Sequence, residues 1–316
     1  MQIGEKYFLT VVEEQSISKA AQKLFITQQS LSEQMQKLER NYGARLFVRK
    51  PKFRLTLEGE ALLSTLQKIH VLESGLDARL LEMKNLRIGR LNVGIHATRA
   101  SVILPEVIPR FRAEYPNVAL NFYNHETFDL EQMLLRGDLD LFFGINAHAL
   151  PEFRMMNIAS EKTYIVASAA YLEKVLGKKA SEIIGIRKKD LPKMELLLSP
   201  PSYNFRRRVD QYLEGVPIPP EHIITIYDYQ LQIELAGRDV GVCFCPQQLL
   251  RSIILPLTER SGKKLLYFPV AGIADANELS IVTHRQAYQS EYMKKFLSIL
   301  LDECRRSLSD QPNIEI

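Results

Sequence analysis

Apolar residues recur every three or four positions in two short segments near the N-terminus, with polar residues between them. The inward positions of the first segment are Ala20, Ala21 and Leu24, and those of the second are Leu31, Met35, Leu38 and Tyr42. This spacing is typical of amphipathic helices. We expect the first helix to begin at Ser18 and the second at Thr27, because Ser and Thr hydroxyls cap the free amides of a first turn.

The outward face of the second helix carries hydrogen-bonding side chains: Gln28, Gln29, Ser32, Gln36, Lys37 and Arg40. Glutamine amides suit the paired donor and acceptor that adenine presents in the major groove of DNA. We therefore predict that bases are read by Thr27, Gln28, Gln29, Ser32 and Gln36, and that Ser30 and Lys37 contact phosphates.

A basic hairpin is expected after this helix. Between Arg45 and Arg54 there are five basic residues and no acidic one, and Lys50-Pro51-Lys52 supplies a turn between two short extended pieces. We assign phosphate contacts to Arg49, Lys50, Lys52 and Arg54, so that the hairpin positions the protein while the helix specifies sequence. Either feature alone is explained equally well by a solvated surface, but their order and spacing together favour a winged DNA-binding unit.

The residues from Tyr7 to Leu63 resemble the LysR-type transcriptional regulators. The resemblance rests on the paired alanines, Thr-Gln followed by Ser-Leu-Ser, Lys-Leu-Glu, the Leu-Phe before the wing, and Leu-Thr with a following Gly. There are two departures: Glu33 stands where such proteins commonly have a basic residue, and the wing between Phe47 and Leu55 is about one residue short. The resemblance implies a winged helix-turn-helix, a linker helix of a dimer, and a C-terminal two-lobed α/β periplasmic-binding-protein-like effector domain.

A long helix is predicted from about Glu58 to Arg87. Its apolar seam consists of Leu62, Leu66, Ile69, Leu72, Leu76, Leu80 and Met83. A helix of this length extends about 45 Å, and its natural partner is a second copy of itself. Packing of the seam within one chain is the alternative.

Strands and helices alternate after Gly89. We expect strands at 91–95, 118–123 and 139–145 in a first unit, and at 163–168, 196–198, 223–227 and 240–245 in a second. Two further strands, 265–270 and 279–283, and a helix at 291–304 are expected to complete the first unit. Alternation of this kind predicts a mainly parallel sheet. The predicted domains are therefore residues 1–58 (DNA binding), 59–88 (linker) and 89–316 (effector binding), with lobe I at 89–161 and 268–304 and lobe II at 162–267.

A ligand is expected between the two lobes, where helix N-termini carry unpaired amides and partial positive charge that suit a small anion or carboxylate. The loops that precede these helices supply Thr98, Arg99, Ser101, Ser202 and Tyr203. The resemblance adds Thr127 and Tyr229. By position alone, Thr98, Thr127 and Ser202 serve equally well as helix caps, and the two tyrosines as core or rim aromatics.

Composition narrows the class of protein. The chain has 316 residues with 46% hydrophobic and 25% charged residues, ordinary values for a folded protein. Residues 1–90 hold fifteen Lys and Arg against ten Asp and Glu, a net charge of +5, so the remainder of the +4 chain sums to −1. The basic excess thus lies in the predicted DNA-binding part. No apolar run reaches membrane-spanning length and the N-terminus lacks a signal-peptide pattern, so we expect a cytoplasmic protein.

Sequence motifs for catalysis and metal binding are weak or missing. The six histidines are scattered without a metal-binding pair, and no phosphate-binding Gly-rich loop or Gly-x-Ser-x-Gly elbow occurs. Cys243 and Cys245 alternate on a predicted strand, which permits redox sensing but is more often simple packing. We expect no cofactor, no metal and no enzyme activity.

The predicted function is sequence-specific transcriptional regulation controlled by a small-molecule effector. The expected partners are an interrupted inverted repeat of double-stranded DNA, the effector, and further copies of the chain in a homodimer or homotetramer. RNA polymerase is a further candidate partner. A solute-binding protein and an α/β enzyme are the alternatives, and the sequence identifies neither the effector nor the target genes.

Overall fold

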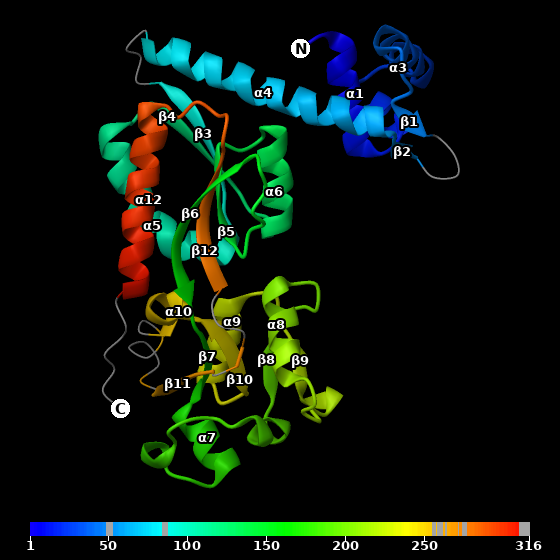
Figure 1. The fold of residues 1–316 in the computed structure, drawn as a ribbon. Coiled ribbons are helices and arrows are strands. Elements are labelled where there is room, and N and C mark those ends of the chain that lie inside the picture. The colour runs from blue at the N-terminus through cyan, green and yellow to red at the C-terminus, as the bar shows by residue number, and fades with distance from the viewer. Residues whose placement is uncertain are drawn as a thin grey trace.

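The computed structural model describes residues 1–48, 53–83, 88–254, 257, 262, 264–270, 272–273 and 277–309. A helical head, a long helix and two stacked α/β lobes follow one another along the chain (Figure 1). The head contains α1 (Ile3–Glu14), α2 (Ile17–Lys23), α3 (Gln28–Tyr42), β1 (Phe47–Val48) and β2 (Arg54–Leu55). The two strands pair antiparallel, as the winged prediction requires.

The head is held together by the apolar faces of its three helices. Ala20, Ala21, Leu31 and Met35 are buried in one cluster with Phe8 of α1. The small alanines let α2 approach α3 closely, as the sequence pattern predicted. The capping role of Thr27 is also confirmed, because its Oγ1 accepts a hydrogen bond from the Ser30 amide at 3.1 Å.

Two expectations for the head were wrong. The N-cap of α2 is Ser16, whose Oγ accepts from the Lys19 amide at 3.3 Å, while Ser18 lies in the first turn. Ser16 has the extended backbone that an N-cap needs, with φ −160°. Tyr42 is not part of the buried stripe, because it lies in the last turn of α3, is 49% exposed, and donates its hydroxyl to Glu5.

The long helix α4 (Leu57–Met83) joins the head to the first lobe. Gly59 permits its close start, since a Cβ there would lie 2.2 Å from the Leu46 carbonyl oxygen. Leu62 and Leu66 are buried in the head, whereas the rest of the predicted seam is exposed in the single chain: Ile69, Leu72, Leu76, Leu80 and Met83. The predicted residues 84–87 lie outside the described part.

Lobe I contains a five-stranded sheet of order β4-β3-β5-β12-β6. Its strands are β3 (Gly89–Gly94), β4 (Val118–Tyr123), β5 (Leu141–Ile145), β6 (Phe153–Glu161) and β12 (Asn277–His284), and its helices are α5 (Ala97–Glu114), α6 (Thr127–Arg136) and α12 (Glu291–Ser309). The helices α5 and α12 pack together on one face of the sheet, and α6 packs on the other.

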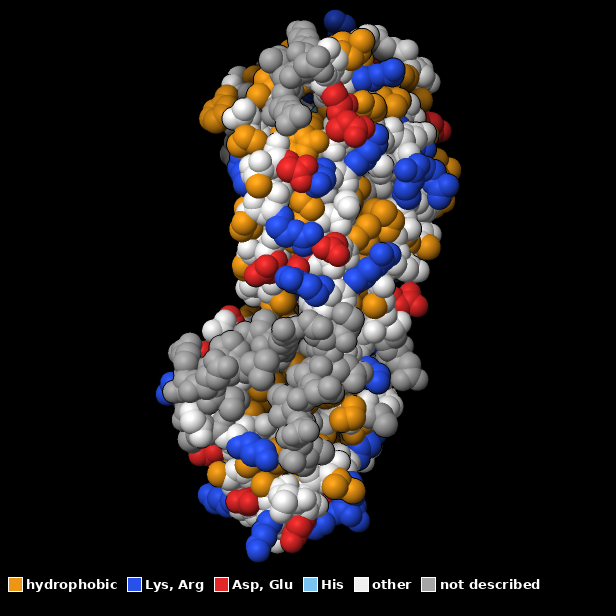
Figure 2. All heavy atoms as spheres, turned by 90° about the vertical axis from the view of Figure 1, so that its left-hand side faces the viewer, with side chains coloured by type: hydrophobic (Ala, Val, Ile, Leu, Met, Phe, Trp, Pro, Cys, Tyr) orange, Lys and Arg blue, Asp and Glu red, His pale blue; other side chains and the backbone are white. Residues whose placement is uncertain are grey.

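The outer surface over α5 and α12 mixes both signs of charge (Figure 2). Arg110 pairs with Asp302 at 2.6 Å, and Lys295 pairs with Glu114 at 2.5 Å. Exposed pairs of this kind contribute about 0.2–1 kcal/mol each. A surface of alternating sign does not suit a polyanion, so this face is not a second phosphate-binding surface.

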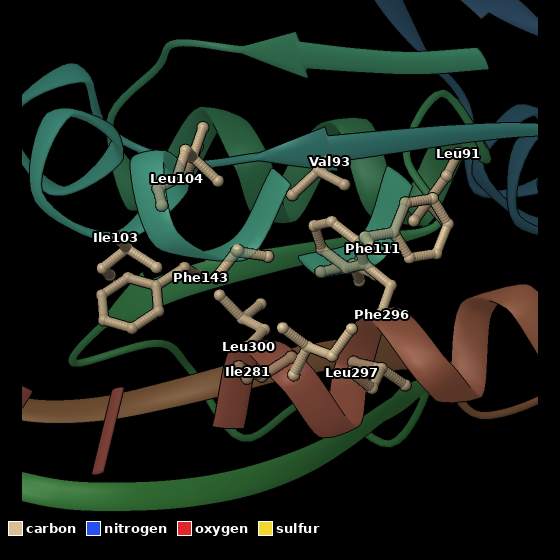
Figure 3. Close-up of a cluster of buried hydrophobic side chains, with 14 of the residues drawn as sticks. Leu91, Val93, Ile103, Leu104, Phe111, Phe143, Ile281, Phe296, Leu297 and Leu300 are labelled. Atoms are coloured by element: carbon tan, nitrogen blue, oxygen red, sulfur yellow. The ribbon is translucent and has the colours of Figure 1, made fainter. Parts of the chain in front are cut away.

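Beneath this surface lies the core of lobe I (Figure 3). Phe111 of α5 meets Phe296 of α12 edge-to-face, with ring centroids 5.3 Å apart. Leu91, Val93 and Ile281 cover them from the sheet. This packing fixes the N-terminus of α5, which reaches the space between the lobes.

Lobe II contains a second five-stranded sheet, of order β11-β7-β10-β8-β9. Its elements are β7 (Thr163–Ser168), α7 (Ala169–Leu176), η1 (Ala180–Glu182), η2 (Lys188–Lys193), β8 (Leu196–Leu198), α8 (Asn204–Leu213), η3 (Pro220–His222), β9 (Ile223–Thr225), α9 (Tyr229–Gly237), β10 (Val242–Pro246), α10 (Gln247–Leu249), the π-helical η4 (Leu250–Ile254) and β11 (Leu265–Pro269). The two clusters of buried residues on either side of the sheet form its core.

Three expectations for the lobes were wrong. The strand 265–269 pairs with β7 in lobe II rather than completing lobe I. The strand β6 was not predicted. The sheets are only partly parallel, because β12 runs antiparallel to both β5 and β6. The reason is topological: the chain leaves lobe I along β6 and returns along β12, so neighbouring crossing strands must run in opposite directions.

Candidate functional site

The outward face of α3 is a surface of hydrogen-bonding side chains. Thr27, Gln28, Gln29, Ser30, Gln36 and Lys37 are exposed, and Ser32 is half-buried. Gln28 accepts a hydrogen bond from Ser18 of α2 at 3.0 Å, which ties the first turn of α3 to the preceding helix. Gln29 donates to Glu33 one turn later, at 3.1 Å. Glu33, the acidic departure noted in the sequence, therefore orients a predicted base-reading amide.

The predicted phosphate contacts divide into described and undescribed residues. Arg54 is exposed on β2, beside the antiparallel strand β1. Arg49, Lys50 and Lys52 lie outside the described residues. Hydrogen-bond donors therefore lie on both the hairpin and α3: Arg54 on the hairpin, and Ser30 and Lys37 on α3.

A cavity of about 60 Å³ lies between the two lobes. The cavity can hold water-sized groups, since one such group needs at least roughly 10–15 Å³. Of the predicted effector residues, Thr98, Arg99, Thr127, Tyr203 and Tyr229 line it. Ser101 and Ser202 do not: Ser101 is exposed and donates to the Thr98 carbonyl at 2.9 Å, and Ser202 is also exposed.

The N-termini of four helices supply much of the lining. They are those of α5 and α6 in lobe I and of α8 and α9 in lobe II, represented by Thr98, Thr127, Tyr203 and Tyr229. The partial positive charge of helix N-termini favours an anion. At α9 the carboxylate of Asp228 already caps the helix by accepting from the Leu231 amide at 3.0 Å, and at α5 the Thr98 amide already donates to His96. The N-termini of α6 and α8, which have no side-chain cap, are therefore the better anion sites.

Arg99 is not available to a ligand in the way that the sequence suggested. It is 3% exposed, and its guanidinium donates through both terminal nitrogens to the carboxylate of Glu161, with one contact at 2.7 Å. Burial opposes its charge, but the adjacent Glu161 outweighs burial, and the pKa of Arg99 is raised. The charge of Arg99 is therefore largely compensated within the protein.

Gln248 completes a buried cluster with this ion pair. Its side-chain oxygen accepts a hydrogen bond from Arg99 at 2.8 Å, and its backbone amide donates one to Glu161 at 2.7 Å. Its side-chain nitrogen donates to Ser307 of α12 at 2.9 Å. The cluster of Arg99, Glu161, Gln248 and Ser307 joins α5, the end of β6, α10 and α12 at the junction of the lobes.

Arg208 of α8 is a cationic residue of the cavity that the sequence prediction missed. It donates to Asn277 at the start of β12, and so links lobe II to the returning crossing strand. Desolvation by burial lowers its pKa. Arg208 lies one turn from Phe205 and from Tyr212, which pack on lobe II, so the helical period was a signal that could have placed it on the inner face.

His96 and Glu126 form a polar contact on the lobe I side of the cavity. His96 Nδ1 accepts from the Thr98 amide at 3.4 Å, so His96, and not Thr98, caps α5, and its Nε2 lies 3.5 Å from Glu126. Burial and Arg99 lower the pKa of His96, while burial and Asp129 raise the pKa of Glu126. Burial thus disfavours the charged form of both groups.

The three cysteines are buried free thiols. Burial raises the pKa of Cys243 and Cys245, both on β10, and raises that of Cys304 to about 12. Thiolates are the reactive form of cysteine, so these environments disfavour redox sensing.

The described residues include neither a metal-binding cluster nor a membrane-spanning helix. They contain no cluster of three or more His, Cys, Asp or Glu with metal-binding geometry. None of the helices within them is both long and apolar enough to span a membrane.

Comparison with known proteins places both parts of the chain. Residues 6–60 match the bacterial regulatory helix-turn-helix protein of the lysR family, and residues 84–305 match the LysR substrate binding domain. The chain is 26% identical to the HTH-type transcriptional regulator BenM of Acinetobacter baylyi over 298 residues, which cover 90% of this chain and 95% of BenM.

Two solved structures share the fold. A full-length OxyR variant from Pseudomonas aeruginosa superimposes with a TM-score of 0.63 at 20% identity, covering 100% of this chain and 99% of that one. Full-length CbnR in complex with its target DNA gives a TM-score of 0.52 at 21% identity, covering 97% and 100%.

The buried ion pair gives a stability prediction. We expect Glu161→Gln to destabilise the protein by about 3–5 kcal/mol in urea unfolding, because it leaves the Arg99 charge buried without its carboxylate. The double variant Arg99→Met with Glu161→Leu should recover most of this loss. As a control, Asp302→Asn removes the exposed pair with Arg110 and should cost less than about 1 kcal/mol. Equal effects of Glu161→Gln and Asp302→Asn would contradict the prediction.

Proposed function

This chain belongs to the LysR family of transcriptional regulators, and we propose that it reads DNA with the outward face of α3 and responds to a small organic anion held between its lobes. The observation that carries the proposal is the connection of two features by one helix. At one end of α4 is a capped helix with a face of exposed amides. At its other end α4 joins lobe I, which encloses with lobe II a cavity lined by helix N-termini and Arg208.

The proposed division of the chain follows from these roles. Residues 1–58 bind DNA, 59–88 link, and 89–316 bind the effector. Lobe II extends from 162 to about 269 rather than to 267, because β11 pairs with β7 through Pro269. Lobe I consists of residues 89–161 and about 270–304.

DNA contacts are divided between the helix and the hairpin. We assign base readout to Thr27, Gln28, Gln29, Ser32 and Gln36, and phosphate contacts to Ser30, Lys37, Arg54 and the basic residues 49, 50 and 52. Phosphate contacts set affinity and its salt dependence, whereas base-edge contacts set sequence preference. The Gln29–Glu33 hydrogen bond holds one reading amide in place before DNA arrives.

We infer from the chemistry of the cavity lining that the effector is a small anion. Arg208 contributes a cationic group, while the charge of Arg99 is matched by Glu161 and His96 is held in its neutral form. The helix N-termini add partial positive charge. Thr98, Thr127, Tyr203 and Tyr229 supply polar groups around it. A small organic carboxylate fits the charge of this lining.

The partners follow from the same arrangement. The exposed seam of α4 suits a second copy of the chain, and a two-fold dimer presents two α3 helices to an interrupted inverted repeat. Contact with RNA polymerase and a cytoplasmic location are further parts of this proposal. A solute-binding protein or an enzyme would leave the helix-turn-helix head without a role.

Selection of DNA fragments tests the function directly. We expect the purified full chain to enrich a common sequence from random duplexes, and we expect a panel of small carboxylates to contain at least one that shifts the affinity for this sequence by about 5- to 150-fold. The readouts are sequencing of bound fragments and fluorescence anisotropy. Failure to enrich any sequence over bulk competitor DNA would overturn the proposal.

The phosphate role of Arg54 predicts a change in salt dependence. Replacing Arg54 by Ala removes one contact from each half-site, two for the proposed dimer, so the slope of log affinity against log salt concentration should fall by about 1.8 for selected and random duplexes alike. Lys178→Ala, an exposed change in lobe II, should leave the slope unaltered. An unchanged slope in Arg54→Ala would remove Arg54 from the interface.

The seam of α4 predicts the oligomeric state. Leu76 and Leu80 are 55% and 47% exposed in the single chain. The double change Leu76→Glu and Leu80→Glu should shift the protein to monomers in analytical ultracentrifugation at micromolar concentration, because a coiled-coil seam does not accept facing carboxylates. Arg79→Glu, an exposed change next to the seam, should keep the dimer. Retention of the dimer mass by the double variant would show that α4 is not the interface.

A further inference from the structure

The turn between α2 and α3 contains a phenylalanine in an unfavourable backbone conformation. Phe25 directly follows Leu24, the C-cap of α2, and has φ 56°. The Ile26 amide donates to the Ala21 carbonyl at 3.0 Å, which is the hydrogen bond of a Schellman helix end. That motif requires a left-handed residue at the position of Phe25, where Gly is usual and Asn is the common substitute.

The side chain does not offset this conformation by packing. The left-handed region brings the Cβ of an L-residue close to the following carbonyl oxygen, so bulky residues are rare there. The other described non-glycine residues with positive φ are the polar Gln15, Asn146 and Asp239. Phe25 is 96% exposed, more than any other large hydrophobic side chain in the described part of the chain. Phe25 therefore combines an unfavourable left-handed backbone with an exposed apolar side chain, and the fold compensates for neither. Such a combination points to a role in function.

The location of Phe25 indicates what covers the ring. It lies two residues before Thr27, the N-cap of the recognition helix, and three before Gln28. In helix-turn-helix proteins the N-terminal residues of this helix are those that contact base edges. The Ser18–Gln28 hydrogen bond joins α2 to α3 across the turn. The backbone that carries the Phe25 ring is therefore held between two connected helices.

We propose that Phe25 is a specificity-determining residue that packs its ring against the 5-methyl group of a thymine in the major groove. The thymine methyl is the apolar group on the base edges of that groove, and phenylalanine is one of the side chains that reads it. The neighbouring side chains of α3 are polar and take the hydrogen-bonding edges of adjacent bases. The inference rests on the proposed DNA-binding function and adds an apolar element to its readout.

The test uses the full-length protein and the duplex that it selects from random DNA. Phe25→Asn removes the ring and suits the left-handed conformation, so the variant should unfold at an equal or higher temperature than the wild type. Its affinity for the selected duplex should fall about 10-fold, roughly 1.4 kcal/mol, in fluorescence anisotropy. Its affinity for random duplex should change less than about twofold. Ile184→Asn, which removes a 91% exposed side chain of lobe II, should change neither affinity.

Substitution within the DNA identifies the contacted group. Replacing thymines one at a time by uracil removes only the methyl group. We expect one such change in each half-site to weaken DNA binding by the wild type but not by Phe25→Asn. Equal losses on selected and random duplexes would indicate a sugar–phosphate contact and overturn the proposal. It is equally overturned by unchanged affinity, or by a lower unfolding temperature, which would show that the ring supports the fold. If the wild type selects no duplex, the proposed function itself fails, an outcome distinct from these.

Discussion

The ion pair between Arg99 and Glu161 is the contact around which the two lobes are arranged. Both side chains are nearly inaccessible, so each depends on its partner: removing two charges from water is costly unless attraction and hydrogen bonds compensate for it. The compensation comes from four different elements, because Gln248 also binds both residues and Ser307. Any relative movement of the lobes that opened this cluster would expose unpaired polar groups. The cluster therefore opposes movement of the lobes apart at this junction.

This arrangement also decides which charge the cavity presents. Arg99 stands on its wall but its charge is matched by Glu161, and burial disfavours the charged forms of His96 and Glu126. Arg208 and the helix N-termini then dominate the field inside. Because Arg208 binds Asn277 on the returning crossing strand, a ligand that engages its guanidinium acts on the connection between the lobes as well as on one wall.

Local signals in the sequence predicted the head well and the lobes less well. The caps and apolar period near Thr27 depend on neighbours within one or two turns, so they identified the start of α3 to the residue. By contrast, whether strand 265–269 belongs to lobe I or lobe II depends on pairing with β7, about 100 residues away. The same limit applies to the site. Thr98 and Tyr203 could be placed at the cavity from helix starts and Thr127 from the family resemblance. The ion pair of Arg99 with Glu161, however, is a contact across 62 residues and left no local trace.

The helix α4 joins these parts because its two faces meet different partners. One face docks on lobe I: Gly75 lies against Tyr288, His70 and Val71 lie against Gly137, and Glu82 accepts from the Glu291 amide at 2.7 Å. The other face carries the exposed leucine seam. In the proposed dimer, α4 is held by lobe I on one side and by a second copy on the other, and it cannot follow both if lobe I moves. A rearrangement at the cavity that displaces lobe I must therefore shift α4, and with it the head that α4 carries, or else break the docking contacts. In the proposed dimer the first outcome would change the spacing of the two α3 helices, to which binding at an inverted repeat is sensitive.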